Sequence, residues 1–176
     1  MGKRLFLNSD VTKIVKLAQR QVVHWTEKEL VIPLVEAKGA GSKRKYTYTN
    51  LLEFSICKTL FDMGLGIHKV KQIAKDLRQD GHLTLWAEDY PGFLKKVGGR
   101  GSEEQNPESH HGILLITFSE HKSLRQIIPY NISYLMGYKS YFHKILSHQG
   151  LIIINLGHIK IAIDSQINKY MHEVIT

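Results

Sequence analysis

The chain has 176 residues, of which 43% are hydrophobic, and its formal net charge is +8. This apolar content is enough for a packed core and excludes wholesale disorder. A single cysteine, Cys57, excludes a disulfide framework and a cysteine-rich zinc site. The longest apolar runs, 112–118 and 151–154, are too short to span a bilayer, and the first residues lack the apolar stretch of a signal peptide. We therefore expect a cytoplasmic protein.

The positive charge is concentrated in the first half of the chain. Residues 1–78 contain 15 Lys and Arg against 7 Asp and Glu, whereas residues 79–176 contain 9 of each kind. Such an asymmetry indicates a half that binds a polyanion and a neutral half. Nucleic acid is the first candidate for that polyanion, and an anionic membrane surface is the second.

Two short helices in close succession are predicted near the N-terminus. Asn8-Ser9-Asp10 predicts a helix N-cap, and the helix that follows has apolar residues at helical spacing and ends near Leu17. A tight turn leads to a second helix, from about Gln19 to Leu30. Two helices this close together are typical of a helix-turn-helix.

The second predicted helix has one apolar and one donor-rich face. Val22, Trp25 and Thr26 share the first face, and the second carries Arg20, Gln21, His24 and Lys28. Arg can bind guanine and Gln can bind adenine through paired hydrogen bonds in the DNA major groove. This face therefore predicts base reading by Arg20, Gln21 and His24, and its alternative interpretation is the solvated face of an ordinary amphipathic helix.

Residues 31–48 predict a wing, which is a β-hairpin beside the helix-turn-helix. Val31–Val35 is β-branched and extended, residues 37–42 form a flexible tip, and Lys43–Tyr48 returns as a basic strand. A basic arm of this kind can lie along a phosphate backbone, although an ordinary solvated hairpin is the alternative. The residues expected to hold the DNA backbone are Lys16, Lys28, Lys43, Arg44, Lys45 and Tyr46.

Two more helices are predicted before residue 79. The third, capped by Thr47 or Thr49, runs from Asn50 to about Met63 and places Cys57 among apolar residues as a buried structural thiol. The fourth follows the glycines at positions 64 and 66, and residues 79–81 close it.

The order and spacing of motifs within residues 5–78 resemble the N-terminal domain of MerR-type regulators. The motifs are Arg44-x-Tyr46-Thr47-x-x-Asn50-Leu51, Gly64-Leu65-Gly66-Ile67-x-x-Val70, His24-Trp25 and Leu30-Val31-x-Pro33. The resemblance implies a winged helix-turn-helix, and a homodimer that binds an inverted repeat and activates transcription by distorting the promoter. Val23, Thr26 and Glu29 depart from the family pattern, which has Arg, Glu and Gly at those places.

The long dimerisation helix of the family is missing from residues 79–111. Pro and Gly residues interrupt any heptad there. We expect a connector instead, with a short strand or turn over Leu83–Tyr90, a helical turn over Phe93–Val97 and a flexible linker over 98–111.

A small α/β (α+β) domain is predicted from Gly112 onward. Its expected elements are a buried strand over Ile113–Phe118, a helix or turn from Leu124 to Ile128, a helix over Tyr138–Leu146, a hairpin of Leu151–Asn155 with His158–Ile163, and a last helix capped by Asp164 or Ser165. The apolar stripe of the last helix, Ile167, Tyr170, Met171 and Val174, offers a surface for dimerisation.

The chain lacks the motifs of an enzyme or a metalloprotein. It has no nucleophile elbow and no carboxylate pair at a useful spacing, so we expect no catalytic activity. Seven histidines lie between positions 110 and 172, but their spacing does not fit a metal site, and we expect no metal or other cofactor.

These patterns predict three parts: a DNA-binding domain over 1–78, a connector over 79–111, and a domain for dimerisation, sensing or partner binding over 112–176. The expected function is sequence-specific transcription regulation by a homodimer on an inverted-repeat operator. Double-stranded DNA is the expected partner, a small-molecule effector or a protein is possible at the C-terminal domain, and no membrane is expected. The alternative is a DNA-tethered adaptor or architectural protein that recruits a protein partner and has no effector.

Overall fold

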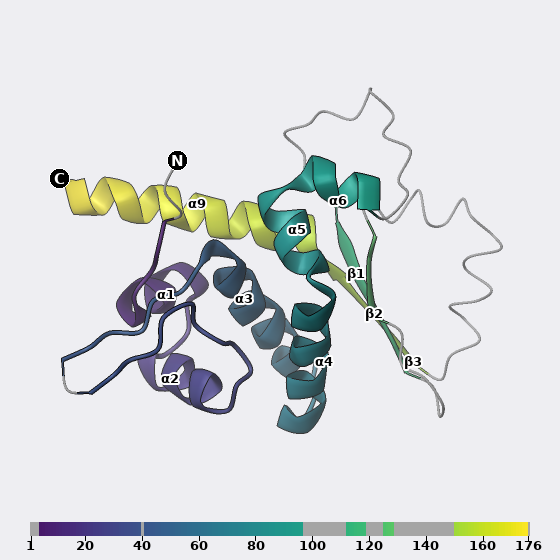
Figure 1. The fold of residues 1–176 in the computed structure, drawn as a ribbon, viewed down its shortest axis with the longest axis horizontal. Helices are drawn as coiled ribbons and strands as arrows, with labels where there is room; N and C mark the ends of the chain where they lie inside the picture. The colour runs from purple at the N-terminus through teal and green to yellow at the C-terminus, as the bar shows by residue number, and fades with distance from the viewer. Residues whose placement is uncertain (1–3, 40, 97–111, 119–124, 129–149, 176) are drawn as a thin grey trace. The chain divides into compact units, whose positions relative to one another are not determined.

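The computed structural model describes residues 4–39, 41–96, 112–118, 125–128 and 150–175 (Figure 1). The chain folds into two compact units: unit 1 comprises Met1–Asp76 with Ile159–Thr176, and unit 2 comprises Leu77–His158. Residues 159–176 therefore group with the N-terminal residues. The boundaries predicted after residues 78 and 111 concern which parts of the chain fold independently, and they stay a prediction.

Four helices account for most of the N-terminal part. They are α1 (Asn8–Val15), α2 (Gln19–Glu27), α3 (Tyr48–Asp62) and α4 (Ile67–Asp80). The four helices expected from the spacing of apolar residues are thus present, and this part of the chain is mostly helical, as a helix-turn-helix requires.

The helix starts differ slightly from those predicted. The cap of α1 is Leu7 rather than a residue of 8–10, and the Asp10 carboxylate closes the turn by accepting the Leu7 N–H at 2.8 Å. Helix α3 begins at Tyr48 because Thr47 is its cap. The Thr47 hydroxyl accepts from the Asn50 N–H at 3.2 Å, and the Asn50 side-chain oxygen accepts from the Thr47 N–H at 2.9 Å. This reciprocal pair satisfies two N–H groups at the helix start.

The core of unit 1 is built on α3. Its residues Leu51, Leu52 and Phe54 are buried, together with Val22 and Trp25 of α2. The Trp25 ring lies 5.0 Å from the Phe61 ring and 6.3 Å from the Phe54 ring, between centroids. Cys57 is buried on the same helix, as predicted.

The prediction that two strands form the wing is wrong. In the described residues of this segment, β pairing is limited to two isolated bridges, Val35 with Lys45 and Tyr46 with Phe6. The second arm cannot continue along the first because Tyr46 pairs with the N-terminal segment and Tyr48 already belongs to α3. We refer to the segment between the bridged residues Val35 and Lys45 as the 35–45 loop.

The connector is helical where a strand or turn was expected. Helix α5 (His82–Glu88) covers most of the predicted strand Leu83–Tyr90, and α6 (Tyr90–Lys96) includes most of the predicted helical turn. Leu83 and Trp86 are both buried, and their spacing of three residues places them on one helical face. The linker 98–111 lies outside the described residues.

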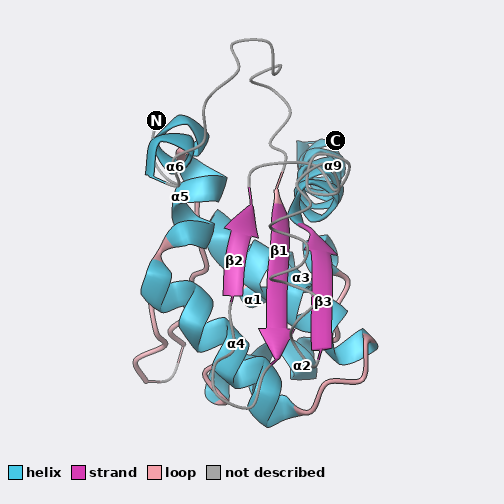
Figure 2. Ribbon diagram, turned by 90° about the vertical axis from the view of Figure 1, so that its right-hand side faces the viewer, coloured by secondary structure: helices cyan, strands magenta, loops and turns pink. Residues whose placement is uncertain are grey.

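Unit 2 contains a three-stranded antiparallel sheet in the order β2-β1-β3 (Figure 2). The predicted strand Ile113–Phe118 is β1, and residues 113–116 are buried. Strand β3 (Gly150–Asn155) was also predicted. The helix or turn expected for Leu124–Ile128 is wrong, since Arg125–Ile128 forms β2 and pairs with β1. The expected helix Tyr138–Leu146 lies outside the described residues.

Gly112 precedes β1 at a point of close approach. A Cβ atom at this position would lie 2.5 Å from the Trp86 indole nitrogen. Only glycine therefore fits beside the buried Trp86 ring without a shift of that ring.

The last helix, α9 (Leu156–Ile175), replaces the second arm of the predicted hairpin. The Asn155 side-chain oxygen accepts from the His158 N–H at 3.0 Å, so the helix is capped at Asn155 rather than at Asp164 or Ser165. Ile163 is 2% exposed and Ile161 is 70% exposed, whereas a strand would place both on one face. Among the described residues, no helix combines the length and apolar character needed to cross a membrane.

Candidate nucleic-acid interface

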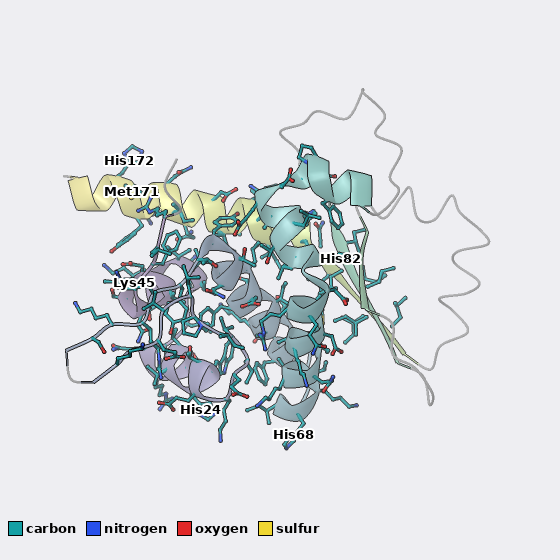
Figure 3. All side chains as sticks on the ribbon, in the orientation of Figure 1. His24, Lys45, His68, His82, Met171 and His172 are labelled. Atoms are coloured by element: carbon teal, nitrogen blue, oxygen red, sulfur yellow. The ribbon has the colours of Figure 1, made fainter. Side chains whose placement is uncertain are left out.

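Helix α2 exposes the face that the sequence assigned to base reading. Arg20, Gln21 and His24 are exposed, while Val22 and Trp25 are buried. Figure 3 shows the His24 side chain on the outer side of α2. The apolar face anchors the helix on α3, and the polar face is therefore available to a ligand.

Gln21 has a second task at the start of α2. The cap residue Ala18 has no polar side chain, and the Gln21 Oε1 atom accepts from the Ala18 N–H at 2.9 Å. Reading adenine through two hydrogen bonds requires Oε1 to accept from the base and Nε2 to donate to it. While the cap is in place, Gln21 presents only its Nε2 donors, which suit a guanine, a thymine carbonyl or a phosphate oxygen.

The turn after α2 contains a left-handed residue that is not glycine. Glu29 has φ 59°, and its carboxylate accepts from Lys71 Nζ at 2.8 Å. Lys28, a predicted phosphate contact, is the exposed C-cap residue of α2. The Leu30 N–H donates to the Trp25 carbonyl at 2.9 Å and closes the turn.

Tyr46 is not available for the predicted backbone contact. Its side chain is 0% exposed, and its hydroxyl lies 3.0 Å from Thr26 Oγ1. Because the Thr26 hydroxyl donates to the Val22 carbonyl at 2.9 Å, Tyr46 is the donor in this pair. Burial raises the pKa of the Tyr46 phenol above its ordinary value. The prediction of a phosphate contact is therefore wrong, and Tyr46 instead ties the residue that follows the 35–45 loop to α2.

The 35–45 loop contains four cations, Lys38 near its start and Lys43, Arg44 and Lys45 at its end. Lys43 and Lys45 are exposed, and the side chain of Arg44 is 21% exposed. The Arg44 Nε atom donates to the Glu36 carboxylate at 3.0 Å. Glu36 thus holds the guanidinium group from its own loop and leaves the terminal nitrogens of Arg44 as donors.

Lys16 marks the end of α1. It has φ 56° and an exposed side chain, and its carbonyl accepts from Lys58 Nζ at 3.3 Å. The Val15 carbonyl accepts from the same ammonium at 3.3 Å. The Lys58 cation therefore satisfies the C-terminal end of α1, where the helix dipole favours positive charge.

A concavity of about 310 Å³ lies between the starts of two helices and the 35–45 loop. Its lining residues are Leu7, Asn8, Ser9, Gln19, Ala37, Ser42, Lys43 and Arg44. The first turns of α1 and α2 present N–H groups without acceptors in their own helix, and this arrangement favours an anion. The sequence predicted Lys43 and Arg44 but missed Asn8, Ser9, Gln19 and Ser42. These residues lie at predicted helix starts and at a loop tip, and those positions could have indicated them from the sequence.

The described part of the chain offers no cluster of metal-ligating side chains. No group of three His, Cys, Asp or Glu side chains there is arranged to hold an ion. Five of the seven C-terminal histidines, at positions 110, 111, 121, 143 and 148, lie outside the described residues.

Comparison with known proteins connects this surface to a family. The profile of the MerR HTH family regulatory protein matches residues 8–77. Curated proteins named as HTH-type transcriptional regulators, from Mycobacterium bovis and from two strains of Mycobacterium tuberculosis, are each 34% identical to the chain over 82 residues. The alignment covers 43% of this chain, and the chain spans about a third (36%) of the length of each relative.

Proposed function

We propose that the protein is a sequence-specific DNA-binding transcription regulator, because residues 8–77 match the MerR HTH family. One observation carries the proposal beyond the family: the exposed donors of α2 belong to the same unit as a concavity that combines two helix starts with Lys43 and Arg44. Such a surface offers both donors for base edges and sites for phosphates. A protein of this kind acts on cytoplasmic DNA and needs no catalytic step.

The residues divide into two roles. Arg20 and His24 read base edges from α2, and Gln21 contributes through Nε2 alone. Lys43, Arg44 and Lys45 hold phosphates from the 35–45 loop in the manner of a wing, and Lys16 and Lys28 add exposed cations at the ends of α1 and α2. The acids Glu27 and Glu36 limit the positive charge, so the phosphate contacts must be few and well placed.

The homodimer on an inverted repeat belongs to the proposal as well. A single helix-turn-helix reads a short half-site, and pairing two half-sites is the usual route to specificity. The stripe of α9 proposed for the dimer is partly used within the chain, since the Tyr170 hydroxyl donates to Asp10 and the Arg4 guanidinium group contacts the Met171 sulfur. The dimer surface must therefore include other residues, and light scattering of the full chain measures whether the dimer forms.

The test of DNA binding compares three variants on duplex DNA by fluorescence anisotropy and by binding-site selection. Arg20→Ala should relax sequence preference, because a good paired contact to a base discriminates by about 1–3 kcal/mol. Arg44→Ala should weaken binding to all sequences alike and reduce the slope of affinity against salt. Lys75→Ala removes one exposed cation from α4 and is the control. Absence of wild-type binding at low salt would refute the function.

A further inference from the structure

The last helix contacts the N-terminal part of unit 1 through side chains at two places. At the first place, the Tyr48 hydroxyl donates to Asp164 Oδ1 at 2.7 Å, and Lys160 Nζ donates to Asp164 Oδ2 at 2.6 Å. The same ammonium lies 5.8 Å from the centre of the Tyr48 ring. Burial and the Asp164 carboxylate raise the pKa of Tyr48 above its ordinary value, which keeps this phenol a hydrogen-bond donor.

The second contact involves the other end of α9. The Tyr170 hydroxyl donates to Asp10 Oδ1 at 2.8 Å, and Lys13 Nζ lies 4.8 Å from the centre of the Tyr170 ring. The Arg4 guanidinium group also contacts the Met171 sulfur. Both residues that Tyr170 contacts belong to α1, the first helix of the helix-turn-helix.

Asp10 joins the last helix to the proposed phosphate site. One oxygen of its carboxylate accepts from Tyr170, and the other accepts from the Leu7 N–H at 2.8 Å and so caps α1. The residues between Leu7 and Asp10 are Asn8 and Ser9, and both line the concavity. A single carboxylate therefore fixes the start of α1 in relation to α9.

Tyr48 connects the last helix to the 35–45 loop, as Tyr170 connects it to α1. It is the first residue of α3 and follows the chain that leaves the 35–45 loop. Within that chain, Lys45 pairs with Val35 and Tyr46 pairs with Phe6. The Tyr48–Asp164 bond therefore holds the end of the segment that carries the loop cations.

We propose that α9 is a positioning helix for DNA binding: its bonds from Asp164 to Tyr48 and from Tyr170 to Asp10 hold α1 and the 35–45 loop segment in the arrangement that meets DNA. The DNA-binding unit is then discontinuous in sequence, and residues 77–158 are inserted between its two segments. This inference rests on the proposed function. It assigns Asp10, Tyr48, Asp164 and Tyr170 as positioning residues that do not touch DNA.

The experiment uses the full chain with Tyr48→Phe and Tyr170→Phe combined, which deletes two hydroxyls and keeps both rings. Ser165→Ala, which deletes a hydroxyl from an exposed position of α9, is the matched control. Two quantities are measured at a temperature where every chain is folded: the affinity for duplex DNA, and the hydrogen-exchange rate of α1 amides. We expect the double variant to bind DNA at least threefold more weakly and its α1 amides to exchange at least threefold faster, with the control unchanged.

The outcomes separate the two proposals. Unchanged exchange and affinity would show that α9 does not constrain α1 and would overturn the inference. Faster exchange with unchanged affinity would make α9 a merely stabilising helix and would also overturn it. If the wild type itself binds no DNA at low salt, the proposed function fails, whereas binding by the wild type with no difference between variants overturns only the role of α9. Rescue is tested by returning Tyr170 alone, which restores the bond to Asp10 of α1 and should recover part of both quantities.

Discussion

The buried pair of Thr26 and Tyr46 allows a quantitative test of how α2 is held. Tyr46 is fully buried, and the acceptor for its hydroxyl is Thr26 Oγ1 at 3.0 Å. The change Thr26→Val keeps the shape of the side chain but removes this acceptor. A buried donor without a partner costs about 1–3 kcal/mol of folding free energy. For a chain of this size, that cost corresponds to a fall in Tm of about 2–12 °C.

A double-mutant cycle isolates the bond itself. Tyr46→Phe removes the donor and leaves the Thr26 hydroxyl bonded to the Val22 carbonyl, so we expect a cost of about 0.5–1.5 kcal/mol. The chain with both changes has apolar groups on both sides. Its cost should therefore fall below the sum of the single costs by about 1 kcal/mol.

Urea unfolding followed by far-UV circular dichroism measures these free energies. Thr84→Val on the exposed side of α5 is the matched control and should change stability by less than about 0.5 kcal/mol. The reasoning is refuted if Thr26→Val costs no more than this control, or if the costs of the two single changes add fully in the double variant.

Three further predictions concern the same unit. Glu29→Gly should raise the free energy of unfolding in urea by up to about 1 kcal/mol, because it removes the strain of a left-handed φ at a residue with a side chain. Lys71→Met breaks only the exposed ion pair and should have little effect on stability. Equal effects of the two changes would contradict this prediction. Burial raises the pKa of Tyr46 in the folded state above the ordinary 10.0, so its contribution to stability is complete below pH 10 and is lost as the pH rises further. Above pH 10, the urea midpoint should therefore fall less steeply with pH in Tyr46→Phe than in the wild type. Gln21→Glu keeps the acceptor for the Ala18 N–H but removes the Nε2 donors, so Tm should be retained while DNA affinity falls; a parallel loss of both would mean that the cap is broken.

The helical half of the fold was predictable because its signals are local. Apolar residues at helical spacing located α1 to α4, and the buried face of α2 followed from Val22 and Trp25. The exposed positions of Arg20 and His24 follow from the same spacing. Thr47 was one of two predicted caps for α3, and the reciprocal bonds with Asn50 select it.

Errors arose where a local pattern fitted two structures. Leu156-Gly157 after an apolar strand is typical of a hairpin turn, and Ile159, Ile161 and Ile163 alternate as a strand would. Positions 159 and 163 are also one helical turn apart, and the Asn155 cap starts a helix instead. The segment Arg125–Ile128 is too short for the spacing of its apolar residues to distinguish a helix from a strand. Its pairing with β1 makes it a strand.

The sequence by itself determined the helix-turn-helix, its exposed donors and the positive charge of the first half, because helix period, capping and charge act between residues close in the chain. Only the tertiary structure decided that Tyr46 is buried against Thr26, that Gln21 caps its own helix, and that Tyr170 of the last helix reaches Asp10. Two of these bonds join residues 20 and 160 positions apart. The free energy that selects such pairs comes from burying groups together, and it depends on which distant segments pack side by side rather than on any local spacing.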